Sequence, residues 1–252
     1  MALAALERAA ERARLAGEGI AGTVRLGYAP TAGFETLGAI LAAVEQDTPN
    51  VTVIASESFS AEIPGRVLAG ELDVGVALHP EPMRGVRSEL LRKEPHVVLV
   101  SQRHRLAGTD PISLNSLENE TLLLFPRELA PAYYDRIIAA FEESGFEPRI
   151  VSFADPPPQA MLARLHAGRE VGLPPASLGS HAAGADSGLV ALKIAPPGVV
   201  AEWSILWAAR APSAAVERFL ESARRCADQN NWLRPPDTPT SAATKASSSA
   251  RI

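Results

Sequence analysis

The residues that could do covalent chemistry are scattered along this sequence rather than grouped. The histidines occupy positions without metal-ligand spacing: His79, His96, His104, His166 and His181. Asp155 precedes three prolines, where a turn residue is a simpler interpretation than a catalytic acid. The sequence contains no G-x-S-x-G elbow, no phosphate-binding glycine loop and no H-E-x-x-H motif. We therefore expect no catalytic residues, no bound metal and no cofactor.

Small polar residues do recur at one kind of position, directly after predicted strands. Thr31 lies between a strand and a helix, and Ser58 and Ser60 follow the next strand. In an open α/β sheet ligands bind at this edge, where hydroxyls and helix N–H groups suit an anion. The alternative is that Thr31 and Ser60 only cap the helices that follow them. Because both fall at one edge, we predict a binding site there.

Alternating strands and helices must position these residues. Strands are predicted over 23–29, 51–55, 73–78, 97–101, 121–125, 149–153, 171–173, 189–194 and 203–208. Helices are predicted over 34–48, 61–70, 133–143, 158–166 and 216–223. Such alternation favours parallel sheets with helices on both sides, which is an α/β fold.

Composition and charge limit the possible partners. Of the 252 residues, 46% are apolar and 21% are charged, and the net charge is −5. A nucleic-acid backbone needs a concentrated basic face, so this stretch alone is not expected to grip one. No apolar run approaches the about 20 residues of a membrane span, and the charged N-terminus does not suit a signal peptide. One cysteine, Cys226, excludes an internal disulfide. We expect a soluble, cytoplasmic protein with no membrane partner.

The two ends of the chain differ from the middle. Residues 2–16 predict a charged helix. Its leucines and alanines, followed by Gly17, recur at alternating spacings of three and four: Leu3, Leu6, Ala10, Ala13 and Gly17. Such a seam pairs with a partner helix or lies on its own domain. The segment 17–22 is a glycine-rich linker. The end of the chain, rich in Pro, Ser, Thr and Ala, predicts a disordered tail.

Several motifs, in order, resemble one known family. They are Gly22-Thr-Val-Arg-Leu-Gly-Tyr-Ala-Pro30, Leu68-Ala-Gly-Glu-Leu-Asp-Val-Gly-Val-Ala77, Ser101-Gln-Arg-His-Arg-Leu-Ala107, Ile112-Ser-Leu-Asn-Ser-Leu117 and Ala167-Gly-Arg-Glu-Val-Gly-Leu-Pro-Pro-Ala176. Together they resemble the effector-binding domain of LysR-type transcriptional regulators, over roughly residues 2–230. The resemblance implies two Rossmann-like lobes joined by two crossover strands, as in periplasmic binding proteins.

The resemblance also implies a domain organisation. Residues 1–21 would end a linker helix, residues 22–93 plus 198–230 would form lobe I, residues 94–197 lobe II, and residues 231–252 the tail. Coils at 93–96 and 194–198 would be the crossovers. The family's winged helix-turn-helix is absent from this sequence, so promoter DNA could be bound only through that missing domain. The implied partners are a small-molecule effector and a homodimer or homotetramer.

Within the family the sequence looks nearest to the muconate- and benzoate-responsive regulators of aromatic catabolism. The resemblance rests on Leu123-Leu-Phe-Pro126, Pro131-Ala-Tyr133 and Asn231-Trp-Leu-Arg-Pro-Pro236. It places the effector-binding positions on Pro30, Thr31, Ala32, Ser60, Leu78, Pro131, Ala132 and Tyr133, and a secondary site on Arg92. Leu78 stands where that subgroup has an arginine. The loss of this cation leaves a monoacid or a neutral aromatic compound as an alternative to a dicarboxylate.

Two other functions share this fold or scaffold. A solute-binding protein of a transporter would have the same two lobes, but it would carry a signal peptide and would not need the seam in residues 2–16. A small-molecule enzyme would need a paired acid and base at the cleft, and none is evident. We therefore expect a sensor domain that is not an enzyme.

Overall fold

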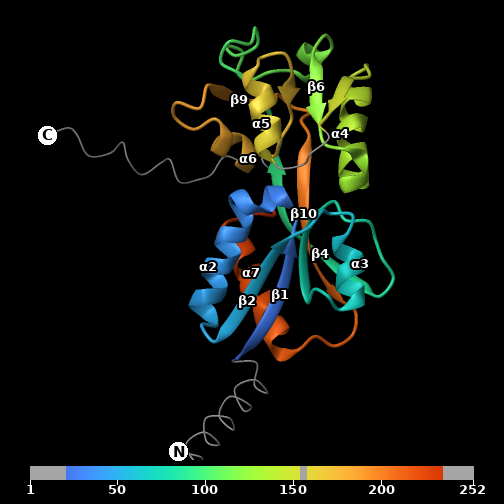
Figure 1. Ribbon diagram of the computed structural model, residues 1–252, viewed down its shortest axis with the longest axis vertical. Coiled ribbons are helices and arrows are strands. Elements are labelled where there is room, and N and C mark those ends of the chain that lie inside the picture. Colours follow the sequence, from blue (N-terminus) through green and yellow to red (C-terminus); the bar gives the residue numbers. More distant parts are fainter. Residues whose placement is uncertain (1–20, 154–157, 235–252) are drawn as a thin grey trace, which may run out of the picture.

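Two α/β lobes are stacked along the long axis of the molecule (Figure 1). The computed structural model describes residues 21–153 and 158–234. The first sheet has the order β2-β1-β3-β10-β4, with bounds Val51–Glu57, Gly22–Tyr28, Val74–Leu78, Val200–Ala208 and Val86–Pro95. The second has the order β7-β6-β8-β5-β9, with bounds Arg149–Ser152, Thr121–Leu124, Val171–Gly172, Val97–Ser101 and Leu189–Lys193. The predicted α/β fold of two lobes is confirmed.

Both sheets are mixed, and the expectation of purely parallel sheets was wrong. Strands β1, β2 and β3 are parallel, but β10 is antiparallel to both β3 and β4. In the second sheet β6 is parallel to β7 and β8, whereas β5 is antiparallel to β8 and β9. The reversed strands β5 and β10 are the ones that enter a lobe from the other lobe. A strand that enters at the edge where the parallel strands end must run against them.

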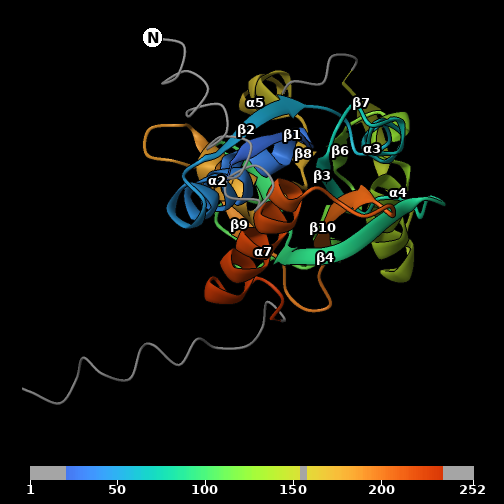
Figure 2. The ribbon, with the colours of Figure 1, turned by 90° about the horizontal axis from the view of Figure 1, so that it is seen from below.

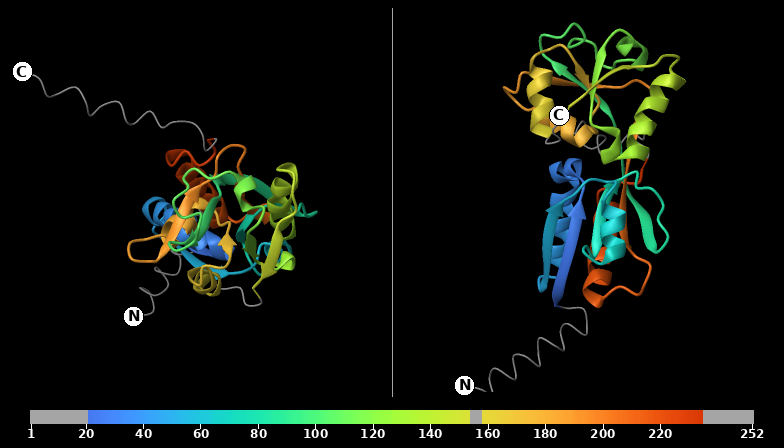
Figure 3. Two further views of the ribbon diagram at one scale, coloured as in Figure 1. Left: turned by 90° about the horizontal axis from the view of Figure 1, so that it is seen from above. Right: turned by 45° about the vertical axis from the view of Figure 1, so that its right-hand side comes forward.

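This topology turns the carboxyl edges of the two parallel strand sets toward each other. The chain leaves the first lobe at the end of β4 and returns through β10, so both connections pass from one lobe to the other at their junction (Figure 3). Ligands in open α/β sheets bind outside the carboxyl ends of the strands. The fold therefore places one binding edge of each lobe across a shared junction.

Strand β4 replaces the coil that the sequence suggested around residues 93–96. It is a continuous strand of ten residues that forms one edge of the first sheet. Its sequence, Val-Arg-Ser-Glu-Leu-Leu-Arg-Lys-Glu-Pro, has charged residues at positions where a buried strand would have apolar ones. Edge strands tolerate such charges, so hydrophobic patterning did not reveal this one. Helix α6 (Ala176–Ala182) was also not predicted, because it directly follows Pro174-Pro175.

Helices cover both faces of the first sheet (Figure 2). Helices α2 (Thr36–Asp47) and α7 (Ala214–Gln229) pack together on one face, where Ile40, Val44 and Phe219 are buried. Helix α3 (Ile63–Ala69) lies on the other face. It approaches β3 so closely that a Cβ added to Gly75 would lie 2.2 Å from Ile63 Cγ2. A glycine is therefore required at this position of the strand.

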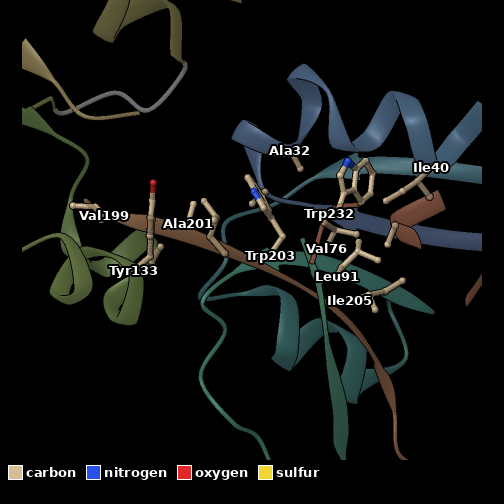
Figure 4. Close-up of a cluster of buried hydrophobic side chains, with 14 of the residues drawn as sticks. Ala32, Ile40, Val76, Leu91, Tyr133, Val199, Ala201, Trp203, Ile205 and Trp232 are labelled. Carbon is tan, nitrogen blue, oxygen red and sulfur yellow. The ribbon is translucent and has the colours of Figure 1, made fainter. Parts of the chain in front are cut away.

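The second lobe has the same layered construction. Helix α4 (Pro131–Glu143) buries Ile137 and Phe141 on one face of the sheet. Helix α5 (Pro158–His166) and α6 bury Leu165 and Leu178 on the other face. Crossover strand β10 joins the cores of the two lobes, since Ala201 and Trp203 are fully buried on it and Tyr133 of α4 lies near them (Figure 4).

Two predictions about the chain ends have different outcomes. The helix predicted over residues 2–16 lies outside the described residues. The disordered tail was expected from residue 231, but this is wrong for the first four residues of the segment. Trp232 is buried, and its carbonyl accepts a hydrogen bond of 2.8 Å from Lys93 N. In the described part of the chain, no helix is long and apolar enough to cross a membrane, and no cluster of His, Cys, Asp and Glu could hold a metal ion.

Candidate functional site

A cavity of about 110 Å³ lies at the junction where the carboxyl edges of the two sheets meet. Its first-lobe wall consists of residues that end or follow strands: Ala29, Pro30, Thr31, Phe59, Ser60 and Leu78. Its second-lobe wall is larger and mainly apolar: Leu123, Leu124, Phe125, Leu129, Ala130, Tyr133, Phe153, Met161, Leu173, Pro174, Pro175 and Leu178. The amide of Ala61 donates 3.1 Å to the carbonyl of Leu129 and so joins the two walls directly.

The two hydroxyls predicted from the sequence both line this cavity. Thr31 lies in the short 3-10 helix η1 (Pro30–Phe34), and Ser60 precedes α3. Neither side chain caps a helix, so the capping alternative is wrong. Instead, Ser60 Oγ accepts a 3.0 Å bond from the amide of Leu78. Because that bond uses an acceptor position of the hydroxyl, its proton remains available to a ligand.

Tyr133 reaches the cavity from the second lobe, and its ring packs against two other rings. It stacks on His79, with a ring-centroid distance of 5.6 Å, and on Phe125, at 5.4 Å, with interplanar angles of 10° and 11°. Its hydroxyl lies 2.6 Å from His96 Nε2. These contacts hold the Tyr133 side chain in place at the cavity wall.

The protonation of the buried Tyr133–His96 pair follows from burial. Complete desolvation lowers the pKa of His96 to about 3 and raises the pKa of Tyr133 well above 10. Both groups are therefore neutral near pH 7, and the 2.6 Å hydrogen bond joins the Tyr133 hydroxyl to Nε2 of His96. The other ring nitrogen of His96, Nδ1, is buried and has no hydrogen-bond partner among the described residues.

Four of the expected site residues lie away from the cavity wall. Ala32 is fully buried in the core of the first lobe. Pro131 and Ala132 begin α4, next to Ala130 and Tyr133 of the wall, but do not line the cavity themselves. Arg92 lines a different and more polar groove, together with Glu35, Glu94 and Ser177. None of these four residues is therefore part of the described cavity wall.

Arg92 has its charge neutralised within the protein. Its guanidinium donates to Thr36 Oγ1 at 2.9 Å, to Glu35 at 2.6 Å and to Glu94 at 3.3 Å. It also lies over the ring of Trp232, 5.1 Å from the centroid. Glu94 in turn accepts from the amide and the hydroxyl of Ser177, at 2.9 and 3.0 Å, so this network links the first lobe to α6 of the second.

Sequence reasoning missed the apolar wall of the second lobe. Leu123, Phe125, Phe153 and Leu173 all end or follow parallel strands of the second sheet. The rule that selected Thr31 and the serines applies equally to these strand ends. Apolar residues at strand ends cannot be told from core residues in the sequence, so the larger, apolar half of the site was not predicted.

The described cavity wall is mostly apolar and carries two hydroxyl-bearing residues, Thr31 and Ser60, besides Tyr133. Among its described lining residues Tyr133 is the one ionisable side chain, and its hydroxyl is engaged by His96. General acid–base or nucleophilic catalysis needs a titratable pair or an activated nucleophile within reach of the substrate. The described walls provide hydroxyl donors, apolar contacts and no such pair.

Comparison with protein families and curated proteins gives a consistent result. A family model described as the LysR substrate binding domain matches residues 17–227. The HTH-type transcriptional regulator TfdS of Cupriavidus pinatubonensis is 31% identical over 169 residues, covering 67% of this chain and 57% of TfdS. AlsR of Bacillus subtilis is 26% identical over 154 residues, covering 61% of this chain and 51% of AlsR. The chain thus spans about half the length of the curated relatives it matches.

Solved structures show the same architecture. The crystal structure of CbnR, a LysR family transcriptional regulator, superimposes with a TM-score of 0.76 at 26% identity, covering 88% of this chain and 75% of CbnR. The effector-binding domain of BenM with its effector benzoate gives a TM-score of 0.73 at 23% identity, covering 85% and 96% of the two chains. At this identity, the similarity to BenM shows that the two domains share a fold.

Proposed function

The chain belongs to the LysR substrate-binding domain family, and from this premise we propose that it is the sensing domain of a transcriptional regulator. It would bind a small aromatic or carboxylate metabolite between its lobes. Its family is one of regulator domains and not of enzymes. The matched relatives are HTH-type transcriptional regulators, which favours this function over a transporter's solute-binding protein.

The observation that carries the proposal is the position of the cavity. It lies where strand ends of both lobes converge, and Thr31 and Ser60 supply hydroxyls on the first-lobe side. A ligand that contacts both walls would stabilise one relative arrangement of the lobes, because its contacts exist only when the walls face each other. This is the property that a sensor needs to pass ligand binding on to the rest of a regulator.

The proposed effector class is supported by the relatives. BenM binds benzoate and QuiR binds shikimate in domains of this fold. We propose that the chain is nearest to the muconate- and benzoate-responsive subgroup, with Thr31 and Ser60 as the hydroxyls that meet the effector. The first N–H groups of a helix have no partner within it, so those of Ala132 and Tyr133 in α4 would extend the site. The groove at Arg92 would be a secondary site.

Several features of the whole regulator remain part of the proposal. Its DNA contacts would come from a helix-turn-helix domain outside this sequence, since the relatives carry that name and the matched segments cover only 57% and 51% of their length. We propose a cytoplasmic homodimer or homotetramer. The lobes would be residues 22–93 plus 198–230 and residues 94–197, with residues 1–21 ending a linker helix.

A thermal-shift and calorimetric screen tests the proposed binding site. The probes are benzoate, cis,cis-muconate and shikimate, and a ligand at 100 times its Kd stabilises the fold by about 2.7 kcal/mol. For a carboxylate that binds, Thr31→Val should weaken binding by about 1.5–3 kcal/mol through loss of one charge-assisted hydrogen bond. Ser58→Ala is the control, because Ser58 is as buried as Ser60 but bonds Glu62 and does not line the cavity. Equal binding by the wild type and Thr31→Val would place the ligand elsewhere.

A further inference from the structure

We infer that this cavity selects an effector that carries at most one charge and whose body is a single uncharged ring. The ligand would direct its one polar group to Thr31 and Ser60 and its ring to the second-lobe wall around Leu123, Met161 and Leu178. The inference rests on the proposed function, since it concerns the ligand of the same site. We therefore expect a dicarboxylate to bind this cavity poorly.

The charge limit follows from the absence of a cation in the described cavity wall. None of the described lining residues is a lysine, arginine or histidine. Arg92 faces a separate groove and is already paired with Glu35 and Glu94. A second carboxylate would therefore be desolvated without an opposite charge, which proteins avoid.

The polar end of the cavity provides for one small group. Its described side-chain donors are the hydroxyls of Thr31 and Ser60, both on the first-lobe wall. The third lining hydroxyl, that of Tyr133, is already engaged in the 2.6 Å hydrogen bond with His96 Nε2. Hydroxyl donors can hold a single carboxylate or a neutral acceptor. These side chains are confined to the first-lobe wall, so on the second-lobe wall a second carboxylate would meet main-chain N–H groups at the start of α4 but no cationic side chain of the described lining.

Size and lining define the rest of the ligand. The cavity volume of about 110 Å³ is below the roughly 300 Å³ of common drug-sized pockets and near the roughly 150 Å³ of an apolar cavity that holds benzene. Opposite the hydroxyls, the wall is made by Leu123, Phe153, Met161 and Leu178, of which each is buried. A single ring fills this volume and matches the apolar surface.

Calorimetry with four matched acids tests the inference on the wild-type chain. The probes are benzoate, 4-nitrobenzoate, terephthalate and cis,cis-muconate. A nitro group has the planar shape of a carboxylate but no net charge, so it separates the effect of size from that of charge. We expect benzoate to bind, and terephthalate to bind at least 10-fold more weakly than 4-nitrobenzoate. Muconate should be at least 10-fold weaker than benzoate.

A designed cation supplies the reciprocal test. Met161→Lys places an ammonium at the apolar end of the cavity on a side chain of similar length, and should improve terephthalate relative to benzoate by at least 10-fold. Ala163→Lys is the matched control, because Ala163 is exposed on the same helix and adds the same charge outside the cavity. It should leave the ratio unchanged. If Met161→Lys does not fold, the four-acid series on the wild type still decides the question.

The possible results separate the two proposals. Tight binding of terephthalate or muconate that is lost in Thr31→Val would overturn the charge limit and leave the proposed site intact. Binding of benzoate that is unaffected by Thr31→Val would refute the site itself. If none of the four acids binds, both proposals fail for this class of compounds.

Discussion

Replacing Glu94 by glutamine should destabilise the protein although it changes few atoms. Glu94 is 4% exposed and accepts four hydrogen bonds. Oε1 accepts from Ser177 Oγ and Trp203 Nε1, both at 3.0 Å, and Oε2 accepts from the Ser177 amide and from Arg92. Glutamine has a donating NH₂ in place of one of these oxygens. In either orientation of the amide, two donors lose their acceptor and face another donor.

The expected loss of stability can be estimated from the two partners that Arg92 keeps, Glu35 and Thr36. Removing one member of a buried ion pair costs about 3–5 kcal/mol because the partner keeps its charge without compensation. Arg92 retains Glu35, at 2.6 Å, and Thr36, so the cost should lie below that range. We expect Glu94→Gln to lower the free energy of unfolding by about 2–3 kcal/mol. In a protein of this size, that corresponds to a Tm lower by about 4–12 °C.

Urea denaturation followed by tryptophan fluorescence measures this loss directly, because Trp203 bonds Glu94 and Trp232 lies under Arg92. Circular dichroism should give the same transition if unfolding is two-state. The matched control is Glu89→Gln on the same strand, whose ion pair with Arg224 is about 40% exposed and should change stability by less than about 1 kcal/mol.

A double substitution completes the argument. If the loss comes from the uncompensated charge, Arg92→Met combined with Glu94→Gln should be less destabilising than the sum of the two single changes by at least about 1 kcal/mol. A loss in Glu94→Gln no larger than in Glu89→Gln would refute the view that Glu94 holds a buried network. Strict additivity would show that the two residues act independently.

Three further outcomes are expected. Tyr133→Phe should lower the free energy of unfolding by about 1–3 kcal/mol in urea titrations, because the buried His96 Nε2 loses its hydrogen-bond partner; unchanged stability would contradict that bond. Stability should also fall by about 2 kcal/mol between pH 7 and pH 5, because the pKa of His96 is about 3 in the fold and near 6.5 when unfolded, so only the unfolded chain gains a proton. Replacing His96 by phenylalanine should reduce this slope. Gly75→Ala should lower the free energy of unfolding by about 1–3 kcal/mol, because the added Cβ overlaps Ile63. Gly38→Ala, in open space on α2, should be neutral or stabilising. Similar effects of the two changes on Tm would contradict the packing argument.

The sequence by itself determined the layered fold and one wall of the site. Apolar strands and amphipathic helices alternate with periods that local patterning reports, and nearly all of the predicted elements are present. Thr31 and Ser60 could be selected in advance because the carboxyl ends of parallel strands share one edge of a sheet. That rule depends on strand order along the chain and needs no knowledge of distant contacts.

The tertiary structure alone decided how the residues between the lobes are used. Trp203 and Glu94 are 109 residues apart in the sequence, but they are hydrogen-bonded in the fold. The same Glu94 carboxylate helps to neutralise the charge of Arg92. The stacking of Tyr133 with His79 and Phe125 and the neutral state of His96 likewise arise when two lobes bury the same groups. Local periodicity carries no information about such pairings, because burial and charge compensation depend on which distant surfaces meet.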